Sequence, residues 1–234
     1  MRQLVSNFSH SFSGKVWNLT LTEDGSSLLF EIRDDEAYQA SYSLLSLEDL
    51  NFIFSDLVFD EDWWIGVTYA DKNYILFHSF ENQDNPDNKT YFVYDVDKSE
   101  VLWARSELNI VDVRNNIAQN IDSESRETMF IDLNTGQDIG DQSFEELAQN
   151  KKLNQTFHYS EGSDYFVTVS KFLASLLNVK VVGGVDYFQS DDLIVISYYV
   201  PWQDGLNNEL IVFTPRKDIL LTSLFLKFVE GEYL

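Results

Sequence analysis

The chain has 234 residues, 44% of them hydrophobic and 15% aromatic, which is enough to build a substantial core. Its 39 acidic and 16 basic side chains give a formal net charge of −23, and such a field repels nucleic acid and anionic membranes. Because the chain has no cysteine, disulfides, thiolate catalysis and cysteine-based metal sites are excluded.

The first predicted element is a β-hairpin over residues 16–33. Apolar and polar side chains alternate on both sides of a turn at Glu23–Ser26, which contains an Asp-Gly pair. This period of two is typical of paired strands, and Asp-Gly favours a tight turn between them. A second hairpin is predicted from Trp63–Tyr69 and Tyr74–Phe80, whose residues alternate in the same way.

One strand–turn–strand pattern is repeated along the chain. Its three copies are Ser43–Phe54, Phe92–Trp103 and Met129–Gly140. In each copy an apolar stretch ends at one polar residue, which is Ser46, Asp95 or Asp132, and a polar corner and an apolar exit follow. The third corner contains Gly136, which suits a positive φ. A period of roughly 40–50 residues with several short strands is typical of β-propeller blades, although three unrelated hairpins of similar composition remain the alternative.

Short helices are considered at three places. Ser46–Asp49 could cap a helix, although the repeat favours strand–turn–strand there. Ser143–Glu146 has a capping-box pattern, and Lys171–Leu177 follows a β-rich stretch, Phe157–Ser170. We therefore expect one or two short helices.

The C-terminal part is predicted to be β-structure that is interrupted at Gly183–Gly184, a pair expected to break the chain. Leu193–Val200 is nearly continuous in β-forming residues, as in a strand buried on both faces. Ile219–Phe228 is strongly apolar and would leave an aggregation-prone edge if it were unpaired, so we expect an integral strand.

Several short motifs resemble known families. Phe92–Trp103 resembles the strand–turn–strand signature of quinoprotein-type β-propeller repeats. From about residue 16 to the C-terminus, the chain resembles an uncharacterised bacterial family of domains of unknown function. The motifs that carry this likeness are Val16–Trp17, Glu31–Asp34, Trp63–Trp64, Leu76–His78, Pro86, Leu102–Trp103 and Ile196–Tyr199. The resemblance implies no known activity, and the quinone-binding residues of propeller dehydrogenases, notably vicinal cysteines, have no counterpart in this sequence.

These patterns predict an all-β protein with a small β-propeller-like repeat fold of four or five blades of antiparallel hairpins and one or two short helices. Residues 1–234 are expected to form one domain, because repeats of this kind bury a core only by stacking on their neighbours. An open or closed barrel of long hairpins is the alternative architecture.

The candidate site for a ligand or partner consists of Asp60, Glu61, Asp62, Trp63 and Trp64. Carboxylates beside aromatic faces suit a cationic ligand or a basic peptide. The alternative is a solvated loop that leads into a buried strand with two packing tryptophans.

No residue set indicates a metal site or a catalytic centre. The three histidines are His10, His78 and His158. They lie far apart in sequence, and His78 alternates with large apolar residues, as a structural histidine would. Asp95, Asp97 and Ser99 space their oxygen atoms as calcium ligands do, but the central glycine and the distal glutamate of an EF-hand are missing. We expect no metal and no cofactor.

The sequence therefore favours a non-enzymatic module that binds a ligand or scaffolds a protein. Its partner would be a basic protein or a cationic ligand. We expect a cytoplasmic protein, because no apolar run reaches the length of a membrane span and no signal peptide is evident. We also expect a monomer. The alternative is a hydrolase or lyase that uses carboxylates in a central propeller channel, which carboxylates of raised pKa would favour.

Overall fold

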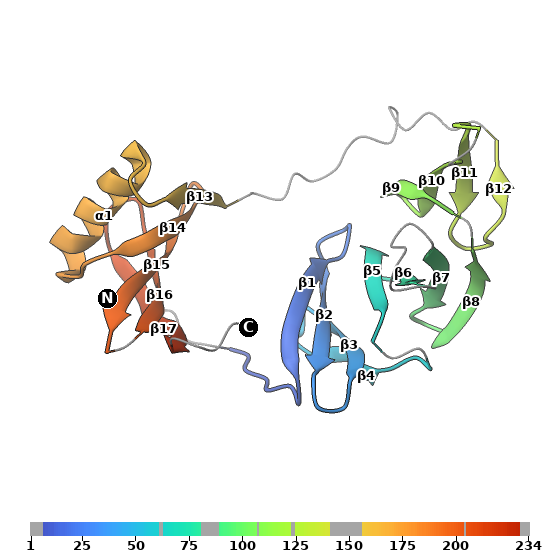
Figure 1. Cartoon of the computed structure of the whole chain (residues 1–234), viewed down its shortest axis with the longest axis horizontal. Coiled ribbons are helices and arrows are strands. Elements are labelled where there is room, and N and C mark those ends of the chain that lie inside the picture. The colour runs from blue at the N-terminus through green and yellow to red at the C-terminus, as the bar shows by residue number, and fades with distance from the viewer. Residues whose placement is uncertain are drawn as a thin grey trace. The chain divides into compact units, whose positions relative to one another are not determined.

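The computed structural model describes residues 7–60, 63–80, 89–106, 108–122, 125–140, 156–203 and 205–229, without the side chains of residues 224–229. These residues form 17 strands in four antiparallel sheets and one helix (Figure 1). The helix is not long and apolar enough to cross a membrane. The chain divides into two compact units, Phe8–Lys151 and Lys152–Leu234 with Met1–Asn7. The prediction that residues 1–234 form a single domain is not tested by this division and stays a prediction.

The first unit contains three consecutive four-stranded sheets. The first sheet contains β1 (Lys15–Leu21), β2 (Ser27–Asp34), β3 (Gln39–Ser46) and β4 (Phe52–Leu57). The second contains β5 (Ile65–Ala70), β6 (Tyr74–Phe80), β7 (Lys89–Asp95) and β8 (Glu100–Arg105). The third contains β9 (Ile110–Arg114), β10 (Ile117–Ile121), β11 (Thr128–Asp132) and β12 (Asp138–Ile139). In every sheet the strands pair antiparallel in chain order, as in a propeller blade, so the predicted all-β, blade-like repeat is confirmed.

The three predicted copies of the repeat are the corners between the third and fourth strands of these sheets. Ser46, Asp95 and Asp132 are each the last residue of the third strand, so all three copies are strand–turn–strand. The helix considered at Ser46–Asp49 is therefore wrong. A capped helix continues into further helical turns after its cap, whereas here the chain reverses into β4, which pairs with β3.

The corners share their backbone conformation as well as their place. The fourth residue after each junction, Leu50, Ser99 or Gly136, has a positive φ of 57°, 56° or 67°. At two corners the junction carboxylate also caps the turn. Asp95 Oδ1 accepts from the backbone N–H of Lys98, and Asp132 Oδ1 accepts from that of Thr135, each at 2.9 Å. The polar residue recurs because it satisfies a turn N–H that has no strand partner.

Two apolar layers pack between the successive sheets of this unit. The layer between the first and second sheets includes Leu29, Tyr42, Leu44, Ile75 and Phe77. The layer between the second and third sheets includes Tyr69, Leu76, Val93, Ala118 and Ile131. Neighbouring residues of β6 thus face opposite layers, which is the alternation that a strand imposes on its side chains.

The turn after β1 links all three sheets through Glu23. Its backbone N–H donates to the carbonyl of Ala70 in β5, at 3.0 Å. Its carboxylate accepts from the Tyr69 hydroxyl and, at 3.0 Å, from the backbone N–H of Asn115 in the β9–β10 turn. Burial raises the pKa of Tyr69, and the hydrogen bond to Glu23 raises it further, so this phenol remains a neutral donor.

The second unit is a five-stranded sheet with one helix. The sheet has the order β13 (Phe157–Ser160), β14 (Val182–Gln189), β15 (Ile194–Trp202), β16 (Gly205–Phe213) and β17 (Ile219–Val229). Helix α1 (Asp164–Leu177) packs Phe166 and Leu173 into a core with Val185, Ile196 and Tyr198. The strand expected at Ile219–Phe228 is confirmed, because β17 pairs along β16. This sheet has one strand more than the blades of the first unit.

Helix α1 is longer than the sequence predicted. The helix at Lys171–Leu177 is confirmed, but α1 begins at Asp164, inside a stretch predicted as β-rich. Ser163 caps it by accepting from the Phe166 N–H at 3.2 Å, and tertiary packing of one apolar side outweighs the β-propensity of its valines and aromatics. The other predicted helix, at Ser143–Glu146, lies outside the described residues.

Two further predictions about this unit are corrected. Gly183–Gly184 does not break the chain but forms a bulge inside β14, where Gly183 has a φ of 75°. The segment Leu193–Val200 is not buried on both faces. In β15, Ile196, Tyr198 and Val200 are buried, whereas the residues between them are only half-buried.

Candidate functional site

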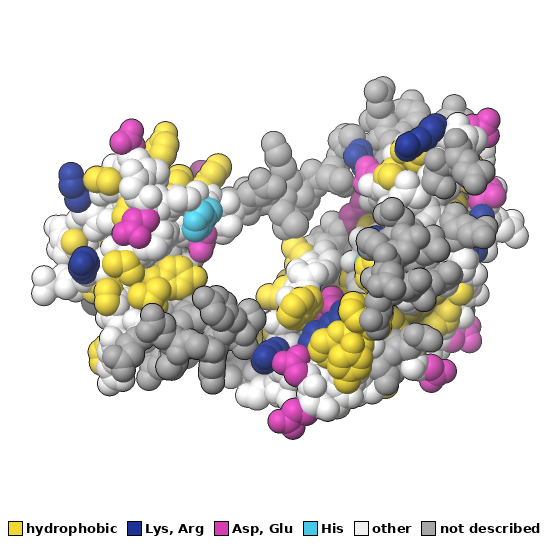
Figure 2. All heavy atoms as spheres, viewed as in Figure 1, with side chains coloured by type: hydrophobic (Ala, Val, Ile, Leu, Met, Phe, Trp, Pro, Cys, Tyr) yellow, Lys and Arg dark blue, Asp and Glu magenta, His cyan; other side chains and the backbone are white. Residues whose placement is uncertain are grey.

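A pocket of about 390 Å³ opens on the first unit. Three separate segments of the chain line it: β1, β2, and the hairpin of β5 and β6 with the two residues before it. The lining residues are Trp17, Glu31, Arg33, Trp63, Trp64, Ile65, Gly66, Val67, His78 and Phe80. On the face of this unit seen in Figure 2, hydrophobic side chains gather beside basic and acidic ones. The pocket is therefore largely aromatic, with a few polar groups.

Trp17 projects from an edge strand because β1 contains a bulge. Val16 pairs with Ile32 and Asn18 pairs with Glu31, so Trp17 is the extra residue between two paired positions. A bulge of this kind redirects a side chain away from the regular alternation of the strand. The Trp17 side chain is 68% exposed, which leaves most of its indole surface available for contact.

An ion pair between Glu31 and Arg33 forms the polar part of the lining. The two residues alternate along β2 and so lie on the same face of the strand, with side chains only 6% and 11% exposed. Arg33 Nε donates to Glu31 Oε1 at 2.9 Å, and Nη2 donates to the same oxygen. Arg33 also donates to the carbonyls of Trp63 and, at 2.6 Å, Ile65. The arginine thus fixes the backbone that leads into β5.

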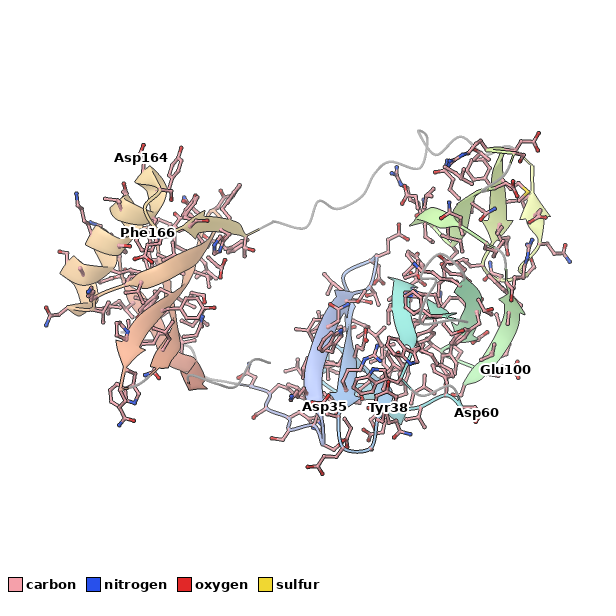
Figure 3. All side chains as sticks on the ribbon, in the orientation of Figure 1. Asp35, Tyr38, Asp60, Glu100, Asp164 and Phe166 are labelled. Atoms are coloured by element: carbon pink, nitrogen blue, oxygen red, sulfur yellow. The ribbon has the colours of Figure 1, made fainter. Side chains whose placement is uncertain are left out.

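Trp63 is held between two neighbours, whereas no described ring or cation stacks on Trp64. The Tyr38 ring stacks on Trp63 with 4.5 Å between centroids and 9° between planes, and the Arg33 guanidinium lies 5.3 Å from the Trp63 centroid. Trp64 is 38% exposed. In Figure 3, Tyr38 and Asp35 lie toward the same end of the first sheet. Trp63 therefore forms a fixed wall, and Trp17 and Trp64 supply the open aromatic surface.

His78 lies across β5 because its partner in the sheet is a glycine. A Cβ on Gly66 would lie 2.8 Å from His78 Cε1, closer than real contacts allow. Thr68, the bulge residue of β5, places its Oγ1 2.8 Å from His78 Nδ1. Burial lowers the pKa of His78 to about 4, and the positive charges of Lys89 and Arg33 contribute. The imidazole is therefore neutral near pH 7.

The pocket includes part of the site predicted from sequence. Trp63 and Trp64 line it, whereas Asp60 is exposed and lies outside the lining. Glu61 and Asp62 lie outside the described residues, so a binding role for the acidic run stays a prediction. Sequence reasoning missed Trp17, Glu31, Arg33, Gly66, His78 and Phe80 as site residues. A signal was present, because several of the short motifs behind the family resemblance meet in this pocket.

One family match covers nearly the whole pocket. Residues 21–103 match DUF4905, a domain of unknown function. This range is less than half of the chain, but it contains every lining residue except Trp17. The resemblance to a domain of unknown function is thus confirmed over the matched range. No curated protein matches the chain.

Solved structures that resemble the chain include β-propeller proteins. The β-propeller domain of the Trilobed protease from Pyrococcus furiosus is 10% identical, with 93% of this chain and 79% of that chain covered and a TM-score of 0.34. Prolyl oligopeptidase B from Galerina marginata is 13% identical, with 90% and 34% covered and a TM-score of 0.36. The chain spans about a third of the length of that peptidase. TM-scores this low support no conclusion about the function of this chain.

Proposed function

We propose that this chain is a non-enzymatic binding module that holds a ligand or a segment of a protein partner in the pocket lined by Trp17 and Trp64. The observation that carries the proposal is the pocket itself, which has three tryptophans and one phenylalanine around a small polar group. Pockets of roughly 300–1,000 Å³ that are mostly apolar and have a few placed polar groups are typical binding sites. Tryptophan is also the side chain that most often anchors a bound partner.

The charge of the chain supports a basic or cationic partner. Its formal net charge of −23 attracts positively charged molecules over a distance comparable to the screening length of the solution. Exposed Asp60 belongs to the acidic run that precedes the two lining tryptophans in sequence. Exposed charges outside a buried contact mainly accelerate association, whereas the aromatic pocket sets how long the complex lasts.

A hydrolase or lyase, the alternative function, would be favoured by carboxyl groups of raised pKa. The described carboxyl groups with a clear shift have lowered values. At Asp49 the Ser46 hydroxyl lowers the pKa, and at Asp95 the backbone N–H of Lys98 does so. Both are turn residues remote in sequence from the pocket lining. These shifts stabilise corners of the sheets, and they favour no catalytic function.

The test of the proposal is selection of peptides that bind the full chain from a random displayed library. The selected peptides are then measured against Trp17→Ala and against a matched control, Trp202→Ala, which removes another exposed tryptophan in the second unit. We expect affinity to fall at least about tenfold for Trp17→Ala, as for an interface anchor, and to stay unchanged for the control. Peptides that bind wild type and Trp17→Ala equally would overturn the proposal.

A further inference from the structure

The pocket lining contains a carboxylate oxygen, Glu31 Oε2, that accepts no hydrogen bond from the described residues. Arg33 directs both Nε and Nη2 to Glu31 Oε1, and it also donates to two backbone carbonyls. No described residue donates to Glu31 Oε2, although the Glu31 side chain lines the pocket and is only 6% exposed. Glu31 Oε2 is not one of the fully buried side-chain atoms that lack a partner, so solvent or a ligand in the pocket can reach it. A carboxylate oxygen accepts a hydrogen bond from a donor placed there.

The groups around Glu31 indicate what kind of donor would fit. Trp17 and Trp64 are exposed side chains of the lining, and aromatic faces attract cations through their negative π-surface. Glu31 and Arg33 are the charged residues of the lining, and His78 is neutral near pH 7. A ligand with a single positive charge and an apolar body matches this combination of an acceptor oxygen with aromatic walls.

The hydrogen-bond pattern also discriminates between cationic groups. A guanidinium binds a carboxylate best through two parallel bonds, one to each oxygen. At Glu31 this arrangement is already blocked, since Oε1 receives two N–H groups from Arg33. Only Oε2 is available, and a single oxygen suits the compact point charge of an ammonium group.

We infer that the pocket binds a primary alkylammonium group, with the ammonium donating to Glu31 Oε2 and the alkyl chain lying on Trp17 and Trp64. Such a group comes either from a lysine side chain of a protein partner or from a free alkylamine. This inference rests on the proposed binding function and adds the ligand class to it.

Binding is tested on the full chain with three capped amino acids of similar length. These are Nα-acetyl-lysine N-methylamide, which keeps its side-chain ammonium group, and its arginine and norleucine counterparts. Dissociation constants are measured by ligand-observed NMR. We expect the lysine probe to bind about tenfold more tightly than the other two, as one charge-assisted hydrogen bond implies. Arginine binding as tightly as lysine, or norleucine binding as tightly as lysine, would overturn the inference.

Two variants assign the effect to the named residues. Glu31→Gln should remove the preference for lysine over norleucine. Because Glu31 also holds Arg33, this variant is read only after its thermal unfolding is compared with that of wild type. Trp17→Ala changes an exposed side chain and should weaken all three probes, whereas Trp17→Phe should largely restore binding. A lysine preference that survives Glu31→Gln in a folded protein would also overturn the inference.

A further arm separates the two sources of the ammonium group. If a lysine side chain is the ligand, the capped lysine binds more tightly than n-butylamine, since the backbone amides add contacts. Equal binding of the two assigns the pocket to a free alkylamine. Failure of the ligand class is distinguishable from failure of the proposed function. Library peptides that need Trp17 but show no lysine preference would leave the binding function standing and refute the ammonium alone.

Discussion

At Gly66 the absence of a side chain keeps the pocket open. A methyl group there would lie 2.8 Å and 2.9 Å from two atoms of the His78 ring. We expect Gly66→Ala to displace the imidazole, to narrow the pocket and to lower the free energy of unfolding by roughly 1–3 kcal/mol, as overpacking does. Chemical denaturation measures the loss. Gly140→Ala is the control, because a Cβ at Gly140 meets nothing within 4 Å, and an equal loss in both variants would contradict the assignment.

His78 should make stability depend on pH. Its pKa is lowered to about 4 in the folded state, mainly by burial, against about 6.5 in an unfolded chain. As pH falls from 6.5 to 4, the unfolded chain takes up this proton and the folded chain does not, so folding is weakened across that window. Solvent at the pocket mouth screens part of the effect, which we expect to be on the order of 1–2 kcal/mol.

The measurement for His78 is the free energy of unfolding of wild type and His78→Gln between pH 7 and pH 4. The variant lacks the titrating ring, so its stability should fall less steeply over this range. Carboxylates shared by both proteins cancel in the difference. Parallel pH profiles for the two proteins would show that His78 does not titrate in this way.

Among the elements, the corner after β11 combines two constraints on one residue. Gly136 has a φ of 67°, and a Cβ there would lie 2.7 Å from the Trp103 ring, whose Nε1 donates to Leu133 O at 2.7 Å. We expect Gly136→Ala to destabilise the chain by roughly 1–3 kcal/mol. Gly162→Ala is the matched control, because Gly162 also has a positive φ but open space around it. The difference in melting temperature between the two variants measures the effect of the clash with the Trp103 ring. Equal losses of stability would show that this clash contributes nothing.

The last strand should be required for a soluble protein. β17 pairs along the full length of β16, and its removal would expose that strand as a new apolar edge. We expect a chain truncated before Ile219 to aggregate on expression. The assay is the soluble fraction together with cooperative unfolding. A truncated chain that stays soluble and unfolds cooperatively would show that β17 is dispensable.

The elements that sequence predicted well are those fixed by local chemistry. The corners at Ser46, Asp95 and Asp132 depend on residues within five positions of each other, so their pattern is visible in the sequence. The pocket depends instead on two bulges, at Trp17 and Thr68, and on the meeting of three distant segments. A bulge shifts side chains by one position without a clear sequence signal. The tryptophans at 63 and 64 could be predicted, but the Glu31–Arg33 pair could not.

At the scale of the whole molecule, the negative charge should govern the rate of binding. Replacing Asp60, Glu61 and Asp62 with Asn, Gln and Asn should slow association with a library-selected peptide and change dissociation little. Association to wild type should also slow as salt rises, because screening acts over about 8–10 Å. Stopped-flow kinetics at low and high salt measure both effects.

The control for this charge experiment is Asp191→Asn with Asp192→Asn, which removes exposed acidic charge from the second unit. The control should leave association nearly unchanged. If the triple variant and the control associate with the peptide at the same rate, and salt has no effect on either, the acidic run is ordinary solvated surface.

The chain-order pairing of strands in the first unit has a consequence for synthesis on the ribosome. Each strand of these sheets pairs with strands adjacent to it in sequence, so its contacts close over short loops and form quickly. Domains generally fold from the N-terminus as the chain emerges. All residues of the pocket lie in β1–β6 and the segment before β5, and their sheets end at Arg105. The nascent chain can therefore shape this pocket before its third sheet and its helix have folded.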